Sequence, residues 1–289
     1  MHAGTKAVTL TCSYCHAPVI SYLKDCISCG NPVGFPNVRA AENEQEQQGL
    51  QERYGDALIS AESGKYRAVF DRFGIVVSGS QAVLARNLLV LDSLVSNASG
   101  MMPTFYKMVR SSARVAENNS WDRGRTAVDS TINPMYHEHI HCSALSLDGK
   151  GLQKFGAYSI TLKEALIKTR STVFEENPFK FLDRMQVSAG KTPPPGYRAA
   201  WTDRGKLAQA KLFRQLTPAT KEDEFPGVLL RDDDDEEKTD YVEVHTYGPL
   251  HRSVIERVIG PVPKASTERA IWRRVKKQLT ALGAQVEEL

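Results

Sequence analysis

Two short stretches in the second half of the chain decide the fold class: HIHCSALSL at residues 139–147 and YVEVHTY at residues 241–247. Polar and apolar residues alternate in both, and such period-two alternation predicts β-strands. Further short runs rich in strand-forming residues stand at 157–162, 171–174 and 228–230, with turn residues between them. The second half of the chain is therefore expected to form a mixed sheet.

The segments on either side of these strands favour helices. Leu50, Tyr54 and Leu58 recur at helical spacing after a polar linker, and apolar residues repeat in the same way over residues 83–95. A third helix is predicted over residues 267–282, with an apolar face opposite a basic one. The sum of helical and strand-rich segments predicts the α+β class.

Length and composition exclude several classes of protein. The chain has 289 residues, of which 41% are hydrophobic and 25% charged, which excludes collagen-like, coiled-coil and globally disordered chains. The best apolar stretch is interrupted by charges and falls short of the ~20 residues that a membrane span needs, and no signal-peptide pattern opens the chain. We expect a soluble, cytoplasmic protein without a membrane partner. Its net charge of +3 is too small to imply nucleic-acid binding by itself.

Four of the five cysteines form two C-x-x-C pairs within the first thirty residues. Two cysteines at this spacing can reach one ion from a tight turn, and a second such turn completes the four-thiolate tetrahedron that Zn²⁺ prefers. The segment looks like a zinc ribbon, a module that serves as a docking surface. A structural zinc ion is therefore expected on four ligands: Cys12, Cys15, Cys26 and Cys29.

Residues 137–141 read His-Glu-His-Ile-His, which as text is the H-E-x-x-H signature of zinc metallopeptidases. That motif works only on a helix, which brings His137 and His141 onto one face while Glu138 activates a zinc-bound water. On a strand, His137, His139 and His141 instead alternate onto one face. A third interpretation gives these histidines no chemistry at all.

The residues that follow favour the strand. HCS at 141–143 is followed by Gly-Leu at 151–152, by FGAY at 155–158 and, far downstream, by YVEVH at 241–245. This order resembles the ADP-ribosyltransferase fold, in whose poly(ADP-ribose) polymerase branch His-Gly-Ser precedes Gly-Leu and Phe-Gly-x-x-x-Tyr, and a late strand carries Glu. Here Cys142 replaces the glycine and the Phe-Gly segment is shorter.

The resemblance covers roughly the last 150 residues and completes the expected architecture. The chain is divided into a small zinc ribbon at residues 1–38, a linker and helical region at 39–130, and an ADP-ribosyltransferase-like domain with a mixed, split sheet at 131–289.

The resemblance implies that the chain is an NAD⁺-dependent ADP-ribosyltransferase. Its catalytic carboxylate would be Glu243, which stabilises the oxocarbenium-like state formed when the nicotinamide–ribose bond breaks. Tyr158 would stack on the nicotinamide, and His141, or else His139, would bond the adenosine ribose. Ser171, at the start of a strand, is a candidate contact for the pyrophosphate.

The resemblance also implies partners. Intracellular single-chain enzymes of this type are commonly toxins or antiviral defence effectors, so a neutralising antitoxin protein is expected. The acceptor would be a macromolecule, RNA or protein: the acidic run at residues 232–237 repels phosphates, whereas the basic tail and the ribbon favour nucleic acid.

Two other functions stay open at this point. One is a zinc metallopeptidase that uses His137, Glu138 and His141. The other is a non-enzymatic adaptor, in which the zinc ribbon and the basic tail bind nucleic acid or protein.

Overall fold

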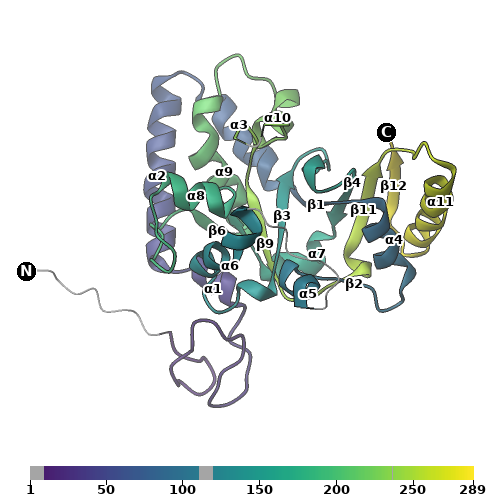
Figure 1. Ribbon diagram of the computed structural model, residues 1–289. Coiled ribbons are helices and arrows are strands. Elements are labelled where there is room, and N and C mark those ends of the chain that lie inside the picture. Colours follow the sequence, from purple (N-terminus) through teal and green to yellow (C-terminus); the bar gives the residue numbers. More distant parts are fainter. Residues whose placement is uncertain (1–9, 111–119, 236) are drawn as a thin grey trace, which may run out of the picture.

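An eight-stranded sheet forms the centre of the computed structural model, with the order β12-β11-β4-β1-β3-β9-β5-β6 (Figure 1). The structure describes residues 10–110, 120–235 and 237–289. Neighbouring strands are antiparallel except β11 and β12, which are parallel. The strands of this sheet are β1 (Gln81–Arg86), β3 (Ile140–Ser146), β4 (Tyr158–Leu162), β5 (Ser171–Phe174), β6 (Arg198–Ala200), β9 (Glu243–Tyr247), β11 (Ile255–Gly260) and β12 (Gln285–Glu288).

Two short strand pairs lie outside the main sheet: β2 (Met101–Met102) with β10 (Leu250–His251), and β7 (Leu230–Arg231) with β8 (Asp240–Tyr241). The α-helices are α1 (Pro36–Ala41), α2 (Glu44–Ser63), α3 (Arg67–Ser78), α4 (Leu88–Ser96), α5 (Phe105–Arg110), α6 (Ser120–Ile132), α7 (Glu164–Ile167), α8 (Pro178–Arg184), α9 (Arg204–Leu212), α10 (Phe225–Leu229) and α11 (Ser266–Ala281). Single 3₁₀ turns are η1 (His137–His139), η2 (Gln153–Phe155), η3 (Lys168–Arg170), η4 (Trp201–Asp203), η5 (Phe213–Gln215), η6 (Glu222–Glu224) and η7 (Arg252–Val254).

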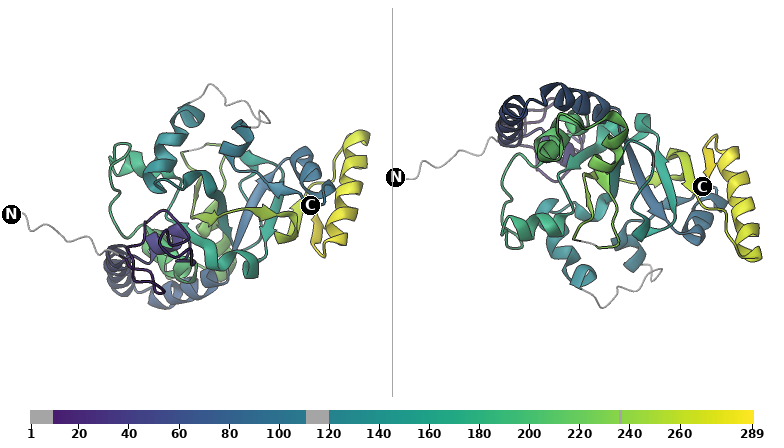
Figure 2. Two further views of the ribbon diagram at one scale, coloured as in Figure 1. Left: turned by 90° about the horizontal axis from the view of Figure 1, so that it is seen from below. Right: turned by 90° about the horizontal axis from the view of Figure 1, so that it is seen from above.

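Two groups of helices lie at the two ends of the sheet. Helices α2, α3 and α9 pack against one another at one end, and α4 packs on α11 at the other (Figures 1 and 2). Apolar side chains from both groups join one continuous core with the sheet, which includes Phe73, Leu145, Val244 and Trp272. Among the described residues, no helix combines the length and the apolar character that crossing a bilayer would need.

The sheet is split between β1 and β3. These two strands pair only where residues 81–83 face residues 144–146. Beyond that point β1 continues along β4 alone and β3 continues along β9 alone. The two strands therefore diverge, and the sheet opens into a half with β12, β11, β4 and β1 and a half with β3, β9, β5 and β6.

The expected α+β class is confirmed, and so are most of the expected strands and the last helix. The helix expected over residues 83–95 is wrong at its start, because residues 81–86 form β1 and α4 begins only at Leu88. Buried on both faces, β1 shows a continuous apolar run that periodicity cannot distinguish from a helix. Asn87 then caps α4 by accepting a hydrogen bond from the Val90 backbone N–H at 2.9 Å.

Two further differences concern the strand pattern. The run expected as a strand at 228–230 mostly ends α10, and only Leu230 enters β7. Strand β1 lies in the middle of the sheet, so the sheet draws residues from both 39–130 and 131–289.

Candidate functional site

The four N-terminal cysteines converge within the cysteine-rich segment, residues 10–34. Their Sγ atoms all lie within 4.8 Å of one another; Cys12 is 3.8 Å from Cys29, and Cys15 is 3.6 Å from Cys26. Four thiolates so arranged can bind one metal ion such as zinc, which would fill its coordination sphere and make it structural.

Two turns of the same shape place these cysteines. The His16 N–H donates to the Cys12 carbonyl at 2.9 Å, and the Gly30 N–H donates to the Cys26 carbonyl at 2.8 Å. His16 and Gly30 both have positive φ, 59° and 72°, which closes each turn and turns its sulfurs inward. Hydrogen bonds from the backbone and side chain of Asn31 lower the pKa of Cys29 to about 6.

Helix α1 ties the cysteine-rich segment to the sheet (Figure 1). The Arg39 guanidinium donates to the backbone oxygens of Leu23 at 2.6 Å and Ser21 at 2.9 Å. On the other side, the buried Asn37 amide donates to the backbone oxygens of Arg170 at 3.0 Å and His245 at 3.1 Å. The segment is thus joined to β9 through two side chains of one short helix.

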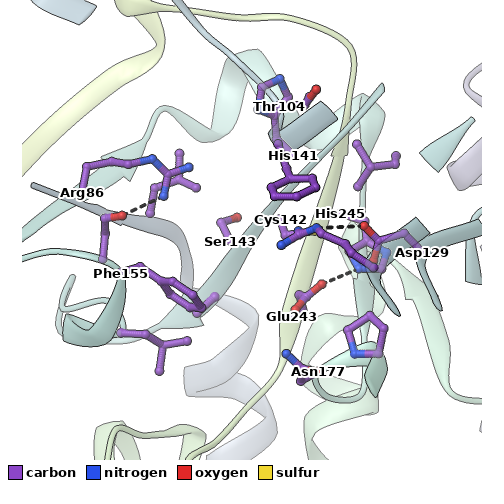
Figure 3. Close-up of a pocket in the computed structure, with 18 of the residues that line it drawn as sticks. Arg86, Thr104, Asp129, His141, Cys142, Ser143, Phe155, Asn177, Glu243 and His245 are labelled. Carbon is purple, nitrogen blue, oxygen red and sulfur yellow. Dashed lines mark hydrogen bonds and ion pairs between the residues drawn. The ribbon is translucent and has the colours of Figure 1, made fainter. Parts of the chain in front are cut away.

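A cavity of about 420 Å³ lies where β1 and β3 diverge. This volume is in the range of small-molecule sites, about 300–1,000 Å³. Figure 3 shows Arg86 and Phe155 on one side of the cavity and Glu243, His245 and Asp129 on the other. Its polar lining comes from Arg86, Asn87, Thr104, Arg125, Asp129, Asn133, His137, His141, Cys142, Ser143, Asn177, Tyr241, Glu243 and His245, and its aromatic lining from Phe105, Tyr106 and Phe155.

Glu243 is a buried carboxylate whose two oxygens are both held. The Tyr241 hydroxyl donates to Oε2 at 3.1 Å, and His245 Nε2 lies 2.8 Å from Oε1. Asn133 Nδ2 lies 3.3 Å from His245 Nδ1, so this ring is oriented from its far side as well. Residues 241, 243 and 245 alternate along the consecutive strands β8 and β9 and meet in one network, so the local sequence Y-x-E-x-H builds it.

Helix α8 brings an amide to the same network. The Asn177 side chain caps the helix by accepting from the Phe179 N–H at 2.9 Å, and its amide donates to the Tyr241 hydroxyl at 3.2 Å. Burial raises the pKa of Tyr241 well above its ordinary value, so its hydroxyl stays protonated and donates to Glu243.

His141 and Ser143 alternate with Cys142 on β3 and therefore point to the other side of that strand. They still line the cavity, because the split leaves the sheet open beside them. Burial, and next to it the positive charges of Arg86, Lys107 and Arg170, lower the pKa of His141 to about 3. The ring is therefore neutral at physiological pH and can donate one hydrogen bond and accept another.

Within the described part of the chain, two side chains of the cavity lining have buried polar atoms without a hydrogen-bond partner. Among the described residues, neither Ser143 Oγ nor the two ring nitrogens of His137 have a hydrogen-bond partner. Such atoms are rare in folded proteins, and they call for a bound molecule or water. Both side chains line the cavity.

Arg86 places a positive charge on the β1 side of the cavity. Its Nη1 donates to the Ala85 carbonyl at 2.7 Å, and burial lowers its pKa, although a guanidinium remains charged. Gly156 lets η2 pack onto this end of β1: its φ is +141°, and a Cβ there would lie 2.0 Å from the backbone carbon of Arg86. This close approach gives a physical reason for the glycine of the Phe-Gly segment.

Helix α6 contributes an ion pair to the cavity wall, and α5 adds a hydrogen bond to it. Arg125 Nε lies 3.1 Å from Asp129 Oδ2, and the Tyr106 hydroxyl donates to the same oxygen at 2.7 Å. Burial raises the pKa of Asp129, and the Arg125 charge opposes that effect. The pair adds little net charge to the cavity.

The structure brings two of the expected NAD⁺ contacts, His141 and Glu243, to the cavity on neighbouring strands. Three others lie outside its lining. The Tyr158 ring packs on Trp272 with centroids 4.8 Å apart, and its hydroxyl donates to the Pro261 carbonyl at 3.1 Å. Tyr158 stands on β4, in the half of the sheet that does not contain Glu243, and α11 covers its ring. Its position therefore gives no support to the nicotinamide-stacking role expected of it.

Ser171 and His139 are likewise occupied elsewhere. Ser171 is buried and shares a hydrogen bond of 2.8 Å with the Thr246 hydroxyl. The exposed His139 ring lies against Tyr247, with centroids 5.6 Å apart. Neither side chain lines the cavity.

Tyr158→Leu is expected to act on stability and not on the site. The substitution keeps an apolar side chain but removes the ring contact with Trp272 and the hydrogen bond to Pro261, so we expect a loss of about 1–3 kcal/mol in the free energy of unfolding. Urea denaturation measures this loss. Wild-type stability in Tyr158→Leu would contradict the packing of this ring against Trp272.

A second prediction concerns pH. Below about pH 6.5 the unfolded chain protonates His141, whereas the folded chain resists protonation down to about pH 3, so stability falls as pH drops through this window. Between roughly pH 7.5 and pH 5 the wild type should lose about 2 kcal/mol more unfolding free energy than His141→Gln. Urea denaturation of both proteins at the two pH values measures the difference, and equal losses would show that the ring is not held neutral.

The H-E-x-x-H motif does not form the helix that a metallopeptidase needs. Residues 137–139 make a single 3₁₀ turn, and β3 begins at Ile140. His137 and His141 both line the cavity, but one stands on a turn and the other on a strand, so they do not share a helix face.

Several cavity residues were not among the expected site residues: Arg86, Arg125, Asp129, Asn133, Cys142, Ser143, Asn177, Tyr241 and His245. A local signal existed for Tyr241 and His245, since period-two alternation places them on the same face as Glu243. No such signal existed for Arg86, because residues 83–86 looked helical.

Comparison with known proteins adds no relative: no protein-family model matches the chain, and no curated protein matches it significantly. The cavity is therefore interpreted from its own residues. Its main features are a buried carboxylate held by two donors, a neutral imidazole, a half-buried cation and polar atoms without partners.

Proposed function

We propose that this protein is an NAD⁺-dependent ADP-ribosyltransferase and that NAD⁺ binds in the cavity at the split of the sheet. The observation that carries the proposal is the position of Glu243. Its carboxylate lies at the floor of a cavity between two diverging strands, on the strand next to His141. A dinucleotide is extended, and an open split gives it a path between the two halves of the sheet.

Glu243 suits the chemistry of the nicotinamide–ribose bond. When this bond breaks, its electron pair goes to the nicotinamide nitrogen and positive charge develops on the ribose. A carboxylate stabilises that charge most strongly where water is excluded and the group is already oriented, as the contacts with Tyr241 and His245 ensure here. The acceptor then bonds the anomeric carbon and releases a proton.

The remaining groups suit the other parts of NAD⁺. Arg86, half-buried on the cavity wall, supplies a positive charge for the pyrophosphate. The neutral His141 ring and the unpartnered Ser143 hydroxyl offer hydrogen bonds to ribose hydroxyls or the carboxamide. Phe155, half exposed on the cavity wall, offers an aromatic face for a base.

The rim favours a protein acceptor over RNA. Asp232 Oδ2 accepts a hydrogen bond of 2.7 Å from the Gln153 N–H, two residues before Phe155. The acidic run at 232–237 therefore starts beside the cavity, where it repels nucleic-acid phosphates and attracts basic side chains. We further propose that the protein acts as a toxin or defence effector and that a partner protein neutralises it.

The test uses NAD⁺ labelled on the adenylate, incubated with the purified protein and a cell lysate. We expect nicotinamide release and label in material that protease removes and nuclease leaves. Label removed by nuclease would correct the acceptor to RNA. Intact NAD⁺ after the incubation would refute the proposal.

A further inference from the structure

Three potential metal ligands meet at the floor of the cavity. The Cys142 sulfur, a Glu243 oxygen and a His245 ring nitrogen all lie within 4.8 Å of one another. The strand register explains why: Cys142 on β3 is directly opposite His245 on β9, and Glu243 stands two residues before it on the same face. Figure 3 shows the three side chains together, and we call them the floor triad.

The donor set suits a thiophilic divalent cation. Sulfur, imidazole nitrogen and carboxylate oxygen are the three ligand types of protein zinc sites, and three protein ligands leave a fourth position for water or substrate. All three residues line the cavity. Glu243 and His245 are 5% and 3% exposed, so few water molecules compete for the ion.

Neighbouring side chains already orient the ligands, as in known metal sites. Tyr241 holds the Glu243 oxygen that faces away from His245, at 3.1 Å, and Asn133 contacts His245 Nδ1 at 3.3 Å. When Nε2 binds a metal, its proton belongs on Nδ1, and the Asn133 amide can turn its oxygen towards that N–H. The histidine therefore keeps a partner in both states.

The charges also balance. A thiolate at Cys142 and the carboxylate of Glu243 carry two negative charges, which a divalent cation neutralises. Arg125 and Asp129 nearby neutralise each other. Binding displaces one proton, from the Cys142 thiol, because the His245 proton only moves from one ring nitrogen to the other.

We propose that the floor triad of Cys142, Glu243 and His245 binds a thiophilic divalent cation, zinc in the first place. This site is separate from the four cysteines at the N-terminus. It shares Glu243 with the proposed function. Because an ion bound to Glu243 occupies the proposed catalytic carboxylate, the ion is expected to inhibit NAD⁺ cleavage.

The test counts metal ions on the full-length chain. Metal-free wild type and Cys142→Ala are reloaded with excess Co²⁺, passed through a desalting column and analysed for metal and protein. The wild type should retain one equivalent more than the variant, and the difference spectrum should show cobalt–thiolate charge transfer. Cys142→Ser, which keeps the size of the side chain, should lose the same equivalent and guards against misfolding in Cys142→Ala.

Equal cobalt content in the wild type and both variants would overturn the floor site. Ser143→Ala is the matched control, since Ser143 neighbours Cys142 and is not part of the triad, and it should keep the wild-type content. None of these counts depends on NAD⁺. Cleavage by the metal-free wild type tests the proposed function by itself, and added Zn²⁺ should then suppress that cleavage in the wild type.

Discussion

The Glu243→Gln variant is expected to bind NAD⁺ with wild-type affinity and to cleave it about 10²–10³ times more slowly, a loss of roughly 3–4 kcal/mol in transition-state stabilisation. The amide keeps the size of the carboxyl group and can still accept a hydrogen bond from Tyr241. It lacks the negative charge, and the ribose carries full positive charge only at the transition state. The loss should therefore fall on kcat, measured as nicotinamide release, and not on the dissociation constant from calorimetry.

Glu138→Gln is the control for this experiment. Glu138 stands on the turn before β3 and is not part of the cavity lining, so the variant should turn over NAD⁺ at the wild-type rate. In a metallopeptidase built on His137 and His141, Glu138→Gln would be the inactive variant and Glu243→Gln the active one. A folded Glu243→Gln protein with full NAD⁺ turnover would refute the assignment of Glu243.

The second large effect is expected at the N-terminus. Cys26→Ser should release the metal ion of the cysteine-rich segment and unfold residues 10–34, because metal binding and folding are one event in such modules, with about 10–16 kcal/mol at stake for structural zinc. The main sheet should survive, since its core lies elsewhere. Elemental analysis and limited proteolysis would detect the lost ion and the new cleavage sites.

Ser28→Ala is the matched control, because Ser28 lies between Cys26 and Cys29, is exposed and cannot act as a sulfur ligand. It should keep both the ion and the protease resistance. Wild-type protein whose four cysteines hold no metal would contradict the zinc prediction, and so would a Cys26→Ser variant that keeps its ion. A secondary loss of NAD⁺ turnover in Cys26→Ser would be consistent with the link from α1 through Asn37 to the His245 carbonyl.

The sequence predicted those elements whose pattern is local. Strands β3 and β9 alternate polar and apolar residues, and this alternation is visible in seven-residue windows. The two C-x-x-C pairs are local in the same sense. Two short turns of the same shape are enough to bring the four cysteine sulfurs together.

Strand β1 and the cavity depend on long-range contacts that no local window contains. Residues 82–85 are apolar because β3 and β4 flank them in the middle of the sheet, and a continuous apolar run does not distinguish a central strand from a helix. The resemblance did include a split sheet, but only the register shows that β1 and β3 diverge after residues 83 and 144. Arg86 reaches the cavity as a result.

Register also decides which side chains meet. Cys142 faces His245 across more than a hundred residues of chain, and a shift of one residue would turn one of them to the opposite face. Tyr158 shows that a local pattern can also suggest a contact that the fold does not make. The Phe-Gly-x-Tyr pattern placed it in the site, whereas α11 at the end of the chain covers its ring with Trp272.

The most direct test of the account is a crystal structure of Glu243→Gln soaked with NAD⁺, since slow turnover should preserve the intact dinucleotide. The account predicts NAD⁺ in the cavity between β1 and β3, with the nicotinamide ribose beside residue 243 and the pyrophosphate on Arg86. A cavity that stays empty at millimolar NAD⁺, or a dinucleotide bound elsewhere on the protein, would contradict it.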